Sequence, residues 1–191
     1  MNSEPNHPDL GALYRHATEV GETVRGWSAK LSLEQTVWQS DPKSWSVAQC
    51  IEHLRITTEQ YRPGVEALII RVRTSDAGRR DAAYRPTLVG GFFLKFVQPT
   101  YRTKLKAPKA FKPDAAGVPA SVLERFADQQ DVLLELIRRA DECDLNRGKL
   151  ASPVSPLVRL TLGDALSILV THQRRHLGQA QRVIDSPVFP G

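Results

Sequence analysis

Hydrophobic residues recur every three or four positions in four long stretches of the chain, the period of an amphipathic α-helix. In the first stretch, residues 9–30, the apolar positions are Leu10, Leu13, Ala17, Val20, Val24 and Trp27. The other three cover residues 46–75, 121–140 and 161–186. No alternating pattern of useful length predicts a β-strand. We therefore expect an all-α fold in which four helices pack as a four-helix bundle.

Capping signals indicate where three of these helices begin. Ser46 is followed three residues later by Gln49, and Ser121 by Glu124, which is the spacing of a capping box. Thr161 is the expected cap of the last helix.

Two stretches interrupt the helical pattern. Pro63-Gly64 should kink or break the second helix, because proline removes a backbone donor and clashes with the preceding turn. Between the second and third long helices, residues 88–97 predict a short extra helix and residues 99–119 a long, proline-rich insertion. Residues 143–160 read as a further loop, rich in proline and serine.

The insertion is basic. No acidic residue falls between Pro99 and Pro113, and the cations there are Arg102, Lys104, Lys106, Lys109 and Lys112. A run of this kind is most often a solvated loop. There are two alternatives to a solvated loop. The insertion could be a lid over a site, or it could be a patch that binds nucleic acid, a membrane or an acidic partner.

Composition is that of an ordinary globular protein. The 191 residues are 41% hydrophobic and 25% charged, which predicts one domain over residues 1–191, and the net charge of +5 admits anionic partners without demanding them. No apolar run approaches the roughly 20 residues of a membrane helix, and the N-terminus lacks the pattern of a secretory signal. We expect a cytoplasmic protein with no membrane partner.

Three histidines carry the candidate chemistry. His172 and His176 are four residues apart, so on a helix they share one face, and His53 lies two turns inside the second helix. Neutral imidazole is the commonest protein ligand for metals, and three imidazoles leave a coordination position open for water or substrate. The alternative is that these are half-buried polar residues without a ligand. His7 and His16 are expected at the surface.

Several neighbours could assist such a site. Gln49 and Thr57 lie four residues to either side of His53 and could orient its ring by hydrogen bonds behind the metal ligands. The simpler interpretations are that Gln49 only caps its helix and that Thr57 faces solvent. Arg174 and Arg175 could attract an anionic substrate or form surface ion pairs. Because Glu52 points away from His53 on a helix, no general base is identified.

The two cysteines are too few and too far apart to indicate a disulfide framework. Cys50 could reach a metal beside His53, but a small buried hydrophobe is the favoured interpretation, and Cys143 looks incidental.

Three segments resemble the DinB-like superfamily. Trp45-Ser46-Val47-Ala48-Gln49-Cys50-Ile51-Glu52-His53-Leu54 is similar to the start of that family's second helix, residues 171–183 to its closing helix, and residues 104–113 to a basic, proline-rich stretch of many members. The resemblance implies a DinB-type bundle, often a homodimer, with a divalent metal held by His53, His172 and His176.

The superfamily includes bacillithiol transferases and the metal-binding domain of mycothiol-dependent maleylpyruvate isomerase. The resemblance therefore implies a metal-dependent transferase or hydrolase that acts on a small molecule, with a low-molecular-weight thiol as a possible cosubstrate. Zinc or nickel is the expected ion, with iron as an alternative. The rival hypotheses are a metal-binding protein without catalysis and a basic adaptor for nucleic acid or an acidic partner.

Overall fold

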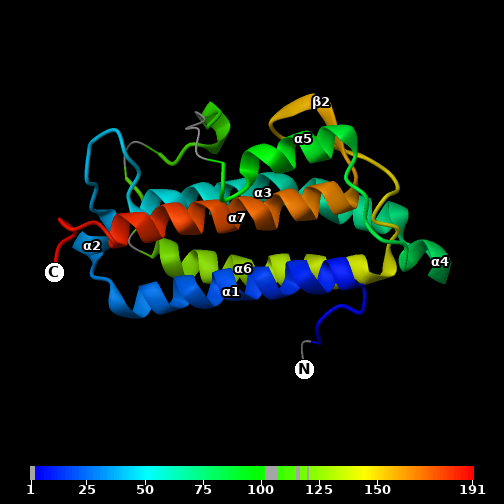
Figure 1. Ribbon diagram of the computed structural model, residues 1–191, viewed down its shortest axis with the longest axis horizontal. Helices are drawn as coiled ribbons and strands as arrows, with labels where there is room; N and C mark the ends of the chain where they lie inside the picture. The colour runs from blue at the N-terminus through cyan, green and yellow to red at the C-terminus, as the bar shows by residue number, and fades with distance from the viewer. Residues whose placement is uncertain (1–2, 102–106, 115–116, 120) are drawn as a thin grey trace.

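Four long helices dominate the computed structural model, which describes residues 3–101, 107–114, 117–119 and 121–191. They are α1 (Pro8–Lys30), α3 (Val47–Val72), α6 (Val122–Arg139) and α7 (Leu162–Ile184). Figure 1 shows α1 and α6 side by side in one layer and α3 and α7 in the other. The expected mostly helical fold is confirmed. No helix among the described residues combines the length and apolar character needed to cross a bilayer.

Shorter elements occupy the connections. They are α2 (Leu33–Val37), α4 (Ala77–Arg80), α5 (Leu88–Val97), the 3-10 helices η1 (Lys109–Phe111) and η2 (Ala140–Glu142), and the strands β1 (Leu150–Ser152) and β2 (Ser155–Leu160). Helix α5 and the hairpin lie against the α3/α7 layer, on the side away from α1 and α6 (Figure 1). We call α5 and the hairpin, with the described residues 82–101, 107–114 and 145–160, the outer layer. Arg102, Lys104 and Lys106 of the basic insertion lie outside the described residues.

Capping boxes set the start of the two helices that carry the histidines. The Ser46 hydroxyl accepts a hydrogen bond from the Gln49 backbone while the Gln49 side chain accepts one from the Ser46 backbone. Thr161 and Asp164 form the same reciprocal pair on α7. The third helix also begins where predicted, but the expected capping box is wrong, because Ser121 makes no side-chain capping bond.

The predicted break at Pro63 is wrong, since α3 is one helix from Val47 to Val72, while the alternative of a kink stays a prediction. Pro63 lies on the solvent side, as does Glu59, whose carbonyl loses its helical partner to the proline. Water can satisfy that carbonyl, so the helix continues.

The hairpin corrects the expectation of a plain loop over residues 143–160. Its strands are too short to show a period, and Pro153 and Pro156 fall within it. Its fold depends on tertiary anchoring instead: Leu150 pairs with Leu160, both are buried, and Ser152 hydrogen-bonds Tyr61 of α3 at 2.9 Å.

A fully buried carboxylate attaches α5 to the start of α7. Asp164 accepts hydrogen bonds from the Tyr84 hydroxyl at 2.7 Å, from the Thr87 hydroxyl at 2.7 Å and from the Thr87 and Thr161 backbone amides at 3.1 Å each. Gly90 of α5 lies directly against this carboxylate.

The interior of the bundle also contains a polar pair. Gln130 of α6 and Gln173 of α7 exchange two amide hydrogen bonds, at 2.9 and 3.0 Å, and Gln130 donates a third to the Ala17 carbonyl of α1 at 2.8 Å. These bonds tie three helices together in the buried centre.

Candidate metal centre

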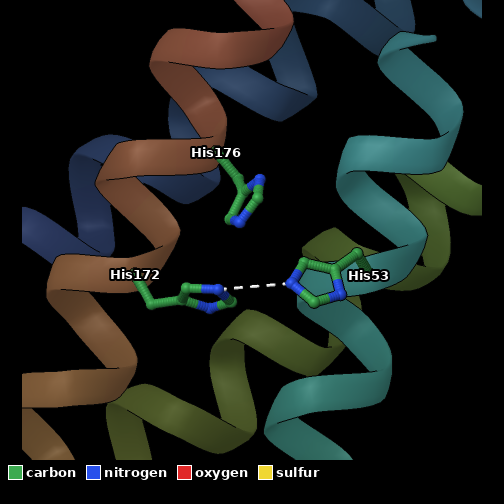
Figure 2. A group of neighbouring side chains, drawn as sticks. All are labelled: His53, His172 and His176. Atoms are coloured by element: carbon green, nitrogen blue, oxygen red, sulfur yellow. Dashed lines mark hydrogen bonds between the residues drawn. The ribbon is translucent and has the colours of Figure 1, made fainter. Parts of the chain in front are cut away.

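The structure brings His53, His172 and His176 together. Each offers one ring nitrogen, and the three atoms lie within 4.8 Å of one another. Figure 2 shows His53 on α3 facing the two histidines of α7. The helical spacing places His172 and His176 on the same face of α7, and the α3–α7 packing brings His53 opposite them.

A backbone carbonyl holds the ring of His53. Its Nδ1 lies 2.6 Å from the Phe111 carbonyl oxygen, which can only accept, so Nδ1 carries the proton. A neutral imidazole carries one such proton, and Nε2 of His53 therefore presents a lone pair toward His172. Phe111 belongs to η1 of the insertion, which thus contributes directly to the site.

The spacing fits a shared cation. Nε2 of His53 lies 3.2 Å from Nε2 of His172. Two imidazoles bound to one tetrahedral zinc at about 2.0–2.1 Å place their nitrogens roughly 3.3 Å apart.

The protonation states also fit. Burial lowers the pKa of His53, although the hydrogen bond that its ring donates to the Phe111 carbonyl opposes the shift. Burial, with the neighbouring histidines and Arg175, lowers the pKa of His172 well below its ordinary value. Burial, His53 and Arg175 lower the pKa of His176 to about 3, although Gln179 opposes the shift. All three rings are therefore neutral at pH 7, the form that binds metal.

Trp45 forms one wall of the site. Its ring centroid lies 4.9 Å from that of His53 and 5.7 Å from that of His176, on which it stacks. Within the described residues, the buried Nδ1 of His176 makes no hydrogen bond of good geometry.

The side chains of Gln49 and Thr57 hydrogen-bond groups other than the histidine rings. Gln49 closes the capping box and accepts from Gln39 at 2.8 Å. Thr57 is buried rather than solvent-facing, and its hydroxyl donates to the backbone carbonyl of His53 at 2.7 Å. Their action on a metal stays a prediction.

The arginines differ in their surroundings. Arg174 is exposed, 3.5 Å from Nε2 of His16. Arg175 donates to the carbonyls of Gln98, at 3.0 Å, and Tyr101, and its guanidinium lies over the Tyr101 ring. Arg175 therefore ties the chain after α5 to α7, beside the histidines.

Cys50 lies one turn before His53, but it is not in the cluster of possible ligands. Burial raises the pKa of its thiol to about 12, although Arg182 opposes the shift. Glu52 forms a double hydrogen bond with Arg55 at 2.8 Å for each contact.

The two remaining histidines, His16 and His7, differ in their burial. His16 is half-buried, so the expected surface position is only partly met, and Glu19 lies 3.3 Å away. The expectation for His7 is wrong: it is buried and caps α1, accepting from the Asp9 amide at 3.2 Å while its Nε2 lies 3.2 Å from the Ala82 carbonyl.

The sequence does carry a signal for this cap, because the next residue, Pro8, has the position that proline favours at a helix start. Phe111 had no such signal, since it acts through its backbone. The other missed contribution is that of Trp45, which the sequence had only placed next to the Ser46 cap.

The family profile of the DinB superfamily matches residues 16–180. The chain belongs to that superfamily, as the resemblance in its sequence implied. No functionally curated protein and no solved structure matches it.

Proposed function

We propose that this protein is a divalent-metal-dependent enzyme that acts on a small molecule, as a thiol-dependent transferase or a hydrolase. One observation carries the proposal: three neutral imidazoles from two helices offer nitrogens within 4.8 Å of each other. In this proposal the four long helices form the DinB-type bundle with its basic insertion, and His53, His172 and His176 hold zinc, nickel or iron.

Three protein ligands suit a catalytic ion, because structural zinc sites use four. A divalent cation there would supply Lewis acidity, which lowers the pKa of a coordinated water or thiol. His172 is only half-buried, so in this proposal a substrate approaches from its side.

The chain itself supplies orientation and shape. The Phe111 carbonyl keeps the His53 proton on Nδ1 and its lone pair on Nε2. The Trp45 ring covers one side of the site. Arg175, which lowers the pKa of two of the histidines, is the cation that favours an anionic substrate or thiolate.

The first test is metal content. We expect one divalent cation per purified chain, and its loss in H172A with an unchanged far-ultraviolet circular dichroism spectrum. H16A is the matched control, because His16 is a partly exposed histidine outside the cluster. Metal retained by H172A at the level of H16A would refute the site.

The second test is activity. Metal-loaded and chelator-treated protein are compared in a screen that pairs low-molecular-weight thiols with electrophiles and includes ester and amide substrates. Turnover that needs metal and is lost in H172A supports the enzyme. If metal restores only thermal stability and no substrate turns over, the site is structural.

A further inference from the structure

Helix α5 has apolar residues on both of its sides. Phe93, Leu94 and Val97 pack against the core, while the opposite side remains open. There Leu88 is 96% exposed and Phe92 60% exposed, and Val89 adds to the same surface. Leu157 of the adjoining strand β2 is 90% exposed. Large side chains exposed together in this way usually mark an interaction surface.

The outer layer contains one acidic residue, Asp114, at the end of the segment 107–114. Between Asp81 and Asp114 the sequence has no acidic residue, and between Asp144 and Asp164 it has none either. The described cations of the outer layer are Arg85, Lys95, Lys109, Lys112, Arg147, Lys149 and Arg159.

These seven cations are exposed, and in the part of the chain that the structure describes none of them forms an ion pair. Arginines elsewhere, such as Arg55 and Arg62, pair with glutamates. The outer layer thus combines exposed apolar residues on α5 and β2 with an excess of positive charge, seven described cations against Asp114.

We propose that the outer layer docks on the surface of an anionic lipid bilayer, with Leu88, Phe92 and Leu157 entering the headgroup region. Amphipathic surfaces with Phe and Leu beside Lys and Arg bind this way, through buried apolar area and attraction to anionic lipid. No membrane-spanning helix is required, so the proposal agrees with the helices described and changes only the expectation of no membrane partner.

Charge decides between the possible occupants. A second copy of the chain, related by twofold symmetry, would place this cationic surface against itself, and like charges in contact are unfavourable. Nucleic acid would satisfy the cations, but the phosphate backbone offers nothing to bury Leu88 and Leu157. An anionic bilayer matches both properties.

The test is sedimentation of the full chain with vesicles of phosphatidylcholine alone or with about 30% phosphatidylglycerol. We expect binding to the anionic vesicles at least ten times stronger, and weaker binding as salt is raised. F92S should lower it about tenfold through lost apolar contact. K95E should lower it at least fivefold through lost attraction.

Two matched controls lie outside the outer layer. I70S removes an apolar side chain that is 71% exposed on α3, and K43E reverses an exposed lysine between α2 and α3. Neither should change binding more than twofold.

Three results would overturn the proposal. The first is equal binding to both kinds of vesicle, or equal effects of F92S and I70S. The second is a dimer in analytical ultracentrifugation that F92S converts to a monomer, because a second copy would then cover this surface. The third is binding to single-stranded DNA that K95E weakens, without binding to vesicles.

Discussion

Replacing Gly90 by alanine tests how closely α5 is fitted to the start of α7. A β-carbon at Gly90 would lie 2.0 Å from Oδ1 and 2.2 Å from Cγ of Asp164. Atoms cannot approach so closely, and Asp164 is fully buried with four hydrogen bonds. Either this carboxylate moves and loses those bonds, or α5 separates from α7.

Breaking a buried charged network costs about 3–5 kcal/mol, while alanine in a helix gains about 1 kcal/mol over glycine. We therefore expect G90A to lower the free energy of unfolding by about 2–4 kcal/mol. At about 2–4 °C per kcal/mol for a chain of this size, the melting temperature falls by at least about 4 °C.

The adjacent glycine is the matched control. A β-carbon at Gly91 would lie 3.8 Å from Cβ of Pro86, which is ordinary contact. G91A should keep the helix-propensity gain and raise stability by up to about 1 kcal/mol. Urea unfolding and thermal melts of both variants measure the difference. If G90A is as stable as G91A, the close packing of α5 on Asp164 is wrong.

Three further predictions concern buried polar groups. In metal-free protein the pKa of His176 is about 3 when folded and about 6.5 when unfolded, so the free energy of unfolding decreases as the pH falls between these values. In urea unfolding, His176 alone should lower it by about 2 kcal/mol at pH 5, and an H176A variant with the same pH dependence would contradict this. Cys50 and Cys143 are buried, and burial raises the pKa values of their thiols to about 12 and about 11. Ellman's reagent should therefore react with both thiols only after denaturation, and rapid reaction with the native protein would contradict their burial. Q173L should lower the free energy of unfolding by about 1–3 kcal/mol, because the buried Gln130 amide loses its partner. In a double-mutant cycle, the double variant with Q130L should regain part of that stability, whereas purely additive effects would show that the two amides are not coupled.

The long helices and the pair His172 and His176 could be predicted because both depend on a repeating pattern in the chain, whereas the resemblance to the DinB-like superfamily supplied His53 as the third ligand. The apolar period of α7 places His172 and His176 on one face, and the capping pair Ser46 and Gln49 sets where α3 begins, two turns before His53. Periodicity and spacing are local properties, and a single sequence displays them.

Features that depend on tertiary contacts could not be predicted. The hairpin is held by single anchors such as Leu150 and Ser152 rather than by an alternating strand pattern. The Phe111 carbonyl reaches His53 across 58 residues, and every residue has a carbonyl, so nothing in the sequence distinguishes this one. Proline at position 63 was misleading because its effect depends on solvent exposure, which is a property of the packed molecule.

The distance along the chain between His53 and His172 is 119 residues, although their ring nitrogens are neighbours. An ion shared by α3 and α7 would therefore close a loop that includes most of the protein. A covalent link across about 100 residues removes roughly 4.7 kcal/mol of unfolded-chain entropy at 25 °C. A cation at this position would act as a reversible cross-link between α3 and α7. Its removal by a chelator would free most of the polypeptide from that constraint in one step.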